Sequence, residues 1–186
     1  MLIPLGILDY PTAVAGVPAY DLLETEILTG SQATVTFSSL GSYSDYQQFQ
    51  IRYAVRTTRD LASDITQIKF NGDSGSNYSW HRLRGNGSAM DSDGQSSQSY
   101  MRATYVPSTL TASNIFGGGV IDILDPFDTN KNTTIRAFGG ETANNYVAIH
   151  SGAWYNTAAL TSITIDQFGT NFVTGSRFSL YGLKAA

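Results

Sequence analysis

The sequence predicts an all-β fold, a single antiparallel β-sandwich, and three observations carry that prediction. Apolar and polar side chains alternate along several short runs, which are rich in Val, Ile, Thr, Tyr and Phe. Clusters of Gly, Ser, Asn and Asp separate these runs, as turns do. No window repeats apolar residues at the spacing of an amphipathic helix over a sufficient length. Because each strand offers one apolar face, two facing sheets would bury all of these faces.

The clearest strand begins at Phe49. Phe49, Ile51, Tyr53 and Val55 point to one side of the backbone, and the residues between them point to the other. Comparable runs elsewhere complete the predicted set of strands, which lie at residues 20–28, 33–38, 49–57, 65–71, 77–84, 100–106, 119–124, 133–138, 146–150, 162–166 and 178–183.

The segments between the strands are predicted to be turns and loops. The glycine-rich segments at 117–119 and 139–140 are expected at hairpin corners, because glycine adopts positive φ at little cost. Residues 85–99 form the least hydrophobic stretch of the chain, which predicts a mobile surface loop. Little helix is expected, with at most a turn near residues 59–64 or 108–113.

Composition limits the classes of partner. The chain has 11 basic and 15 acidic residues among 186, a net charge of −4, and its few arginines form no dense cluster, so we expect no nucleic-acid partner. It contains no cysteine, which excludes disulfides and thiolate metal sites and suits folding in a reducing cytoplasm. No stretch approaches the ~20 apolar residues of a membrane-spanning helix, so we expect no membrane partner.

The first 19 residues differ from the rest of the chain. Residues 1–19 are apolar, nearly uncharged and contain three prolines, which excludes a regular helix and predicts an extended N-terminal arm ahead of a sandwich domain at 20–186. This arm either packs on its own domain or lies across a neighbouring subunit, where its apolar side chains would be covered. The candidate interface residues are Leu2, Ile3, Leu5, Ile7, Leu8 and Tyr10.

Several segments, in order and with similar spacing, resemble a family of uncharacterised phage virion proteins. They include YDLLET at 20–25, ATVTFSSL at 33–40, FNGDSGSNYSWH at 70–81, IDILD at 121–125 and GSRFSLYGLK at 175–184. The resemblance covers nearly all of the chain after residue 19. It implies a jelly-roll sandwich and a place in the virion, assembled in the cytoplasm of a bacterial host, and it carries no catalytic residues to transfer.

Two functions from different classes follow as hypotheses. The first is a capsid decoration (cement) protein, a homo-oligomer expected to be a trimer, which stabilises the capsid by binding the major capsid protein. The alternative is a tail-fibre or tail-tip domain that binds host surface carbohydrate through an exposed cluster containing Trp80 or Trp154. The candidate glycan or subunit contacts are Trp80, Tyr100, Trp154 and Tyr155. An enzyme such as a depolymerase is the third interpretation.

Catalytic chemistry finds little support in the sequence. The two histidines, His81 and His150, are expected to be hydrogen-bonded strand residues, and no G-x-S-x-G nucleophile motif is present. The glycines at 117–119 lack the Lys and Ser/Thr of a phosphate-binding loop. We therefore expect no catalytic residues, no cofactor and no metal.

Two groups of carboxylates are candidates for a metal site or a catalytic pair. The segment Asp91-Ser92-Asp93-Gly94 resembles the start of a calcium loop, but Arg102 stands near the position where such a loop needs its bidentate Glu. A glycosidase needs two carboxylates across a cleft, and Asp122, Asp125 and Asp128 lie close together in the chain, yet the sequence around them favours turn capping.

Overall fold

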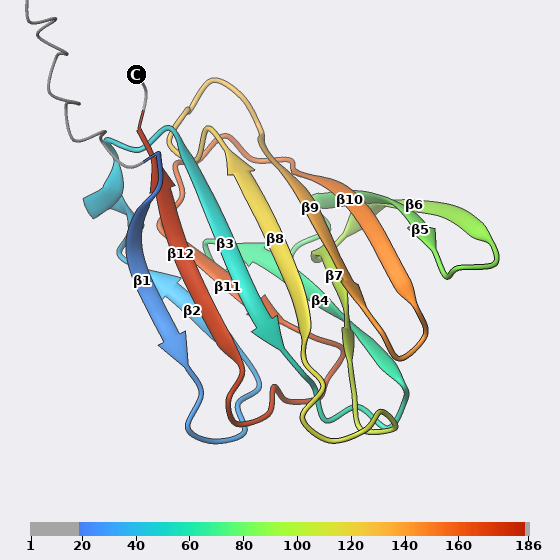
Figure 1. Cartoon of the computed structure of the whole chain (residues 1–186). Coiled ribbons are helices and arrows are strands. Elements are labelled where there is room, and N and C mark those ends of the chain that lie inside the picture. The colour runs from blue at the N-terminus through green and yellow to red at the C-terminus, as the bar shows by residue number, and fades with distance from the viewer. Residues whose placement is uncertain (1–18, 185–186) are drawn as a thin grey trace, which may run out of the picture.

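The computed structural model describes residues 19–184, which form an all-β sandwich of two antiparallel sheets (Figure 1). The large sheet has the strand order β1-β12-β3-β8-β9-β10-β5-β6, and the small sheet has the order β2-β11-β4-β7. The strands are β1 Asp21–Ile27, β2 Val35–Ser38, β3 Gln48–Val55, β4 Ser63–Phe70, β5 Tyr78–Gly85, β6 Met90–Gln98, β7 Met101–Pro107, β8 Gly117–Leu124, β9 Thr133–Glu141, β10 Tyr146–Trp154, β11 Ser162–Asp166 and β12 Arg177–Leu183. The predicted sandwich is confirmed and is jelly-roll-like.

The N-terminal arm is outside the part of the chain that the structure describes. Residues 1–18, which include Leu2, Ile3, Leu5, Ile7, Leu8 and Tyr10, are not described, so the arm and its contacts stay a prediction. Within residues 19–184 no helix is long and apolar enough to cross a membrane.

The alternation of apolar and polar residues in the sequence predicts which side chains form the core. The β3 side chains Phe49, Ile51 and Val55 are fully buried between the sheets, and Tyr53 is almost so. They belong to one continuous apolar cluster with side chains of the small sheet such as Phe70. In Figure 1 the large sheet lies in front and the small sheet behind it, so the small sheet leaves the opposite face of the large sheet uncovered.

The segment predicted as a mobile loop is instead largely a strand. β6 pairs with β5 along most of its length, with Arg84 opposite Asp91 and Arg82 opposite Asp93. Its sequence, MDSDGQSSQ, lacks the apolar alternation of a strand because it forms the sheet edge and buries neither face. Backbone pairing and ion pairs to β5 take the place of core packing here.

The glycines predicted at hairpin corners lie inside strands. Gly119 in β8 and Gly139 in β9 face the small sheet. A Cβ on Gly119 would lie 2.5 Å from Cζ of Tyr53, and one on Gly139 would lie 2.7 Å from the Gly118 carbonyl oxygen. They are therefore required by close approach and not by turn geometry. Among residues 19–184 the one short helix is a 3-10 turn at Leu40–Tyr43, away from both segments where a helical turn was predicted.

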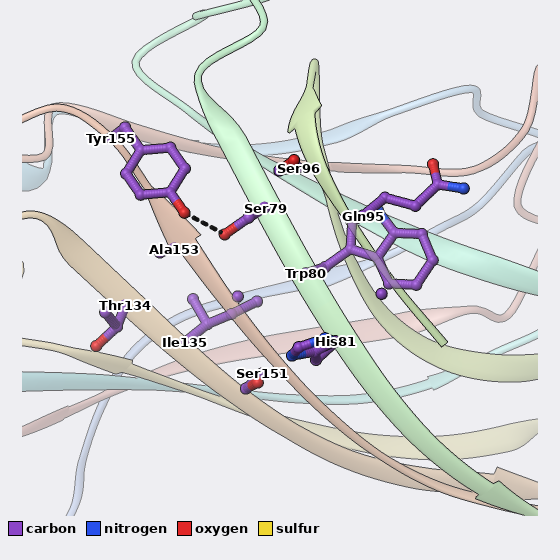
Figure 2. Close-up of a pocket in the computed structure, with 12 residues that line it drawn as sticks. Ser79, Trp80, His81, Gln95, Ser96, Thr134, Ile135, Ser151, Ala153 and Tyr155 are labelled. Atoms are coloured by element: carbon purple, nitrogen blue, oxygen red, sulfur yellow. Dashed lines mark hydrogen bonds between the residues drawn. The ribbon is translucent and has the colours of Figure 1, made fainter. Parts of the chain in front are cut away.

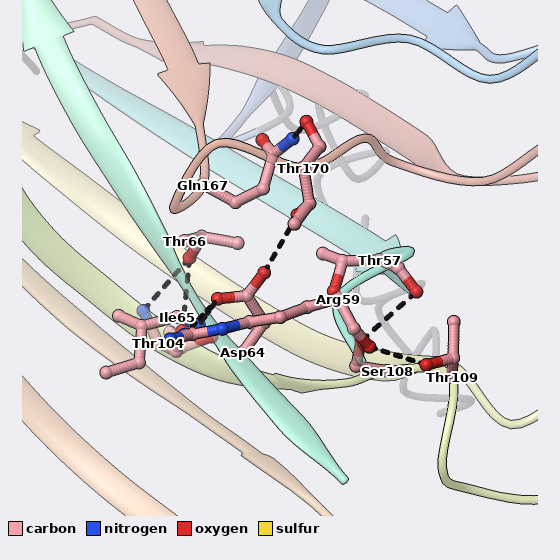
Figure 3. Close-up of polar contacts among 10 residues, drawn as sticks. All are labelled: Thr57, Arg59, Asp64, Ile65, Thr66, Thr104, Ser108, Thr109, Gln167 and Thr170. Carbon is pink, nitrogen blue, oxygen red and sulfur yellow. Dashed lines mark hydrogen bonds and ion pairs between the residues drawn. The ribbon is translucent and has the colours of Figure 1, made fainter. Parts of the chain in front are cut away.

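A buried polar network joins the loops at one end of the sandwich (Figure 3). The Asp64 carboxylate is 1% exposed and pairs with Arg59 at 3.0 Å. It also accepts hydrogen bonds from the Ile65 amide at 2.8 Å and from the Thr170 hydroxyl at 3.2 Å. Because Arg59 and Thr170 come from separate loops, the network fixes these loops relative to each other. Its carboxylate is enclosed, so we assign it a structural role.

Candidate functional site

The outer face of the large sheet, which the small sheet leaves uncovered, divides into two chemically different halves. One half, here called the apolar half, consists of Leu83, Val120, Phe138, Val147 and Ile149. The other half is a groove with a polar lining, here called the polar groove. Both are built by the same strands, β9, β10 and β5, with β8 added on the apolar side and β6 on the polar side.

Strand register assembles the apolar half. Val120 stands opposite Phe138, Phe138 opposite Ile149, and Ile149 opposite Leu83, so four consecutive strands contribute one side chain each to a single row. Directly opposed side chains of antiparallel strands are close enough to touch. Phe138 and Ile149 are 57% and 54% exposed. Next to this row Val147 borders a hollow of about 500 Å³.

The apolar half has the character of an interaction surface. Single exposed apolar residues are normal on proteins, but contiguous exposed apolar side chains with a polar rim mark a binding surface. The rim here is a chain of polar contacts. Arg136 Nε contacts Asp122 Oδ2 at 2.7 Å, the Gln50 amide donates to Asp122 Oδ1 at 2.7 Å, and Arg52 donates to Gln50 Oε1 at 2.6 Å.

The polar groove occupies the other half of the same face and has a volume of about 720 Å³ (Figure 2). The side chains that line it from the outer face are Ser79, His81, Ser96, Thr134, Ser151 and Tyr155, whereas Gln95 stands opposite the buried Trp80 and points to the other side (Figure 2). Register again sets the arrangement, since His81 stands opposite Ser151, and Ala153 lies between Ser79 and Thr134. The small side chains Ser151 and Ala153 lie on the central strand, which leaves room above it.

Tyr155 is held in a fixed orientation at one end of the groove. It directly follows β10, and its amide donates to the Asn77 carbonyl at 2.7 Å. Its hydroxyl donates to Ser79 Oγ at 3.0 Å, as Figure 2 shows. The ring is nevertheless 53% exposed. An aromatic face is thus presented to solvent with its position already set.

At the opposite side of the groove, a glycine determines where the His81 ring lies. A Cβ on Gly94 would lie 1.8 Å from Cδ2 of His81, so the imidazole of His81 lies directly against the backbone of β6. Because only glycine admits this contact, Gly94 fixes where the imidazole can lie.

The tryptophans that the glycan hypothesis required to be exposed are buried. Trp154 is 1% exposed; its indole N–H donates to Asp73 Oδ2 at 2.7 Å, and its ring packs on Phe70 and Tyr78. Trp80 is 2% exposed, and the Arg102 guanidinium lies 3.9 Å from the centre of its ring. Because both indole rings are buried, neither ring is available to contact a glycan.

The two tyrosines predicted as contacts differ from each other. Tyr155 is exposed and lines the groove, whereas Tyr100 is partly buried against the ring edge of Phe168, with ring centres 5.6 Å apart. Of the four predicted glycan or subunit contacts, the structure places only Tyr155 with its ring available at the groove.

The two histidines lie on opposite faces of the large sheet. His81 points outward into the groove, and His150 is fully buried between the sheets. Burial and the nearby Arg82 and Arg102 lower the pKa of His150 to about 3, so the imidazole is neutral at pH 7. Neither of its ring nitrogens has a hydrogen-bond partner among residues 19–184, which corrects the expectation of a hydrogen-bonded strand histidine.

The candidate carboxylates are engaged by basic residues. Asp91 and Asp93 of β6 form ion pairs with Arg84 and Arg82, so they do not form the start of a calcium loop. Lys131 lies 2.7 Å from Asp125 and 3.4 Å from Asp128. Asp128 also accepts the Asn130 amide at 2.8 Å, which fits the turn capping that the sequence favoured. Within the described part of the chain, no group of three or more His, Asp or Glu residues could hold a metal ion.

Comparisons with known proteins add little. No family model and no curated protein matches the chain. Among solved structures, the CBM40 of a Ruminococcus gnavus IT-sialidase bound to α2,3-sialyllactose is similar with a TM-score of 0.38 and 8% identity over 89% of this chain and 95% of that one. A mutant of the alginate lyase Aly36B in complex with alginate tetrasaccharide gives a TM-score of 0.28 and 8% identity over 87% of this chain and 80% of that one. Scores this low carry no argument about function.

Proposed function

We propose that this protein is a non-catalytic structural component of a phage particle, a capsid decoration (cement) protein that attaches to the major capsid protein through its apolar half. The observation that carries the proposal is the row of Leu83, Val120, Phe138 and Ile149 across four neighbouring strands of an uncovered sheet face. The resemblance of the sequence to phage virion proteins supplies the biological setting.

The energetics of such an attachment are favourable. Fully burying one Ile, Leu, Val or Phe side chain contributes roughly 1.5–3 kcal/mol, and Phe138, Val147 and Ile149 each expose more than half of their surface. An interface that forms only on the assembled shell stabilises the shell by mass action. The flat, strand-built face needs no rearrangement to dock, so little binding energy is lost to ordering it.

The oligomeric state and the arm belong to the same proposal. We expect a homotrimer, in which residues 1–19 cover neighbouring surfaces. Deleting these residues should weaken attachment to the particle and leave the melting temperature of the sandwich nearly unchanged. Light scattering of the full chain and of the truncated chain measures the number of copies in each.

Cosedimentation with particles assembled without this protein tests the proposal. Phe138→Ser should weaken attachment by roughly 2 kcal/mol, about thirty-fold. Leu110→Ser is the matched control, because Leu110 is 67% exposed on the loop between β7 and β8 and lies off the outer face. Equal attachment of the two variants would overturn the proposal.

The polar groove favours a second candidate function, a tail-fibre or tail-tip domain that binds host surface carbohydrate. An exposed, fixed tyrosine among hydroxyl side chains is the observation that favours it. The position of the gene distinguishes the two candidates, since a neighbouring capsid gene favours decoration and neighbouring tail genes favour adhesion.

A further inference from the structure

We infer that the polar groove between β6 and β9 is a binding site for a short, neutral oligosaccharide. The inference goes beyond attachment to the particle, because the groove and the apolar half are separate regions of the outer face and are tested by separate variants.

The hydrogen-bonding groups of the groove match a carbohydrate. Serine and threonine hydroxyls each offer both a donor and an acceptor, as sugar hydroxyls do, and the imidazole ring adds a further hydrogen-bonding group. These groups come from Ser79, His81, Ser96, Thr134 and Ser151, which lie on four adjacent strands. Because they converge on one hollow, a ligand with hydroxyls around its ring can pair with several of them at once.

The charge of the groove selects a neutral ligand. The described residues that line it include no Lys, Arg, Asp or Glu. Arg136, which stands opposite Ser151 on β9, is already paired with Asp122 at 2.7 Å. An acidic sugar or a phosphate would therefore meet no free cation in the lining, whereas a neutral sugar leaves no charge without a partner.

Tyr155 supplies the apolar contact that sugar rings use. The C–H face of a sugar ring packs on an aromatic face, and an aromatic side chain that is already fixed loses little entropy on binding. The hydrogen bond to Ser79 and the backbone bond to Asn77 fix this ring before any ligand arrives. Tyr155 is also the only aromatic side chain exposed in the groove, so a protein partner would find no cluster of apolar anchors there.

The size of the groove indicates an oligosaccharide. It crosses four strands, β9, β10, β5 and β6, which at roughly 4.8 Å per spacing is about 14 Å. A volume of about 720 Å³ lies within the range of small-molecule sites, ≈ 300–1,000 Å³. One sugar ring would leave much of this length unfilled.

The test uses the full-length protein on an array of neutral and acidic oligosaccharides, followed by calorimetric titration of the strongest ligand. We expect binding of neutral oligosaccharides. Tyr155→Ala should weaken that binding at least ten-fold, and Tyr155→Phe, which keeps the ring and loses the hydroxyl, by less than about three-fold. Ser151→Leu should abolish binding, because the leucine side chain fills the groove. Tyr155 is unchanged in this variant.

Phe138→Ser on the apolar half is the control that should bind the oligosaccharide as the unaltered protein does. Thermal melts of all variants confirm folding, and since Tyr155 and Ser151 are exposed, little stability should be lost. The inference is overturned if the array shows no neutral ligand, if only acidic ligands bind, or if Tyr155→Ala and Ser151→Leu bind normally. Particle attachment is measured separately, so failure here leaves the decoration proposal untouched.

Discussion

The two halves of the outer face are made by the same strands and yet have opposite chemistry. On β10, Val147 and Ile149 face outward in the apolar half, and two residues further along Ser151 faces outward in the polar groove. On β5 the change falls between Leu83 and His81. A sheet face that only contacted water would not need an apolar half beside a polar groove. The comparison teaches that strand register can divide one sheet face into an apolar region and a polar region without separate domains.

The largest effect is expected from removing two side chains of the apolar half together. Phe138→Ser combined with Ile149→Ser should weaken particle attachment by roughly 4 kcal/mol, about a thousand-fold, because two opposed anchors lose their burial. Oligosaccharide binding should not change. Cosedimentation and calorimetry on the same preparation measure both quantities, and a parallel loss of both would show that the halves are not independent.

A pH titration examines the buried residue beneath the boundary between the halves. His150 lies inside the sandwich between the outward-facing Ile149 and Ser151. Its folded pKa of about 3 is below the unfolded value of 6.5, so below pH 6.5 the unfolded chain takes up a proton that the folded chain does not. The free energy of unfolding should therefore fall by up to about 1.4 kcal/mol per pH unit between pH 6.5 and 3.

Denaturant unfolding at pH 7, 5 and 4 measures this fall. His150→Gln should reduce the slope, since glutamine does not titrate, even if the variant is less stable at pH 7. His81→Gln is the matched control, because His81 is exposed on the outer face. A slope that His150→Gln leaves unchanged would assign the acid sensitivity to other groups.

A smaller effect, confined to the polar groove, is expected from Gly94→Ala. The added methyl group would lie where the His81 ring now lies, so the imidazole must move. Oligosaccharide affinity should fall several-fold and particle attachment should stay the same. Calorimetry with His81→Ala provides the reference, because that variant should lose a similar amount if the imidazole contributes to binding.

The smallest effect is expected at the rim. Asp122→Asn removes the ion pair with Arg136, whose side chain is 68% exposed, and such exposed pairs contribute about 0–1 kcal/mol. Attachment should change less than five-fold, and more at low salt than at high salt. If Asp122→Asn weakened attachment as much as the double apolar variant does, the interface would be centred on the rim and not on the apolar row.

Most of the fold was predictable from the sequence because burial of one strand face leaves a period of two. Phe49 to Val55 shows that period, and the structure buries the predicted side chains. β6 could not be found in this way, since an edge strand with two exposed faces has no such period. Gly119 and Gly139 were wrongly predicted at turns for another reason, because close contact with a neighbouring strand also selects glycine.

The candidate site was much less predictable than the fold. Phe138, Ile149 and Leu83 are far apart in the chain and form a row only once the strand register is fixed. The sequence predicts Trp154 as a glycan contact beside a polar loop, but Asp73 accepts its indole N–H and the ring joins the core. The one usable signal was Tyr155, an aromatic residue at the end of a strand with polar residues after it.

Imaging of an intact particle at side-chain resolution tests the central claim most directly, because it shows both halves of the outer face at once. The account predicts that Phe138 and Ile149 lie buried against a neighbouring virion protein, while Tyr155 and its groove face solvent. A particle in which the apolar half faces solvent, or in which a protein fills the groove, would contradict it.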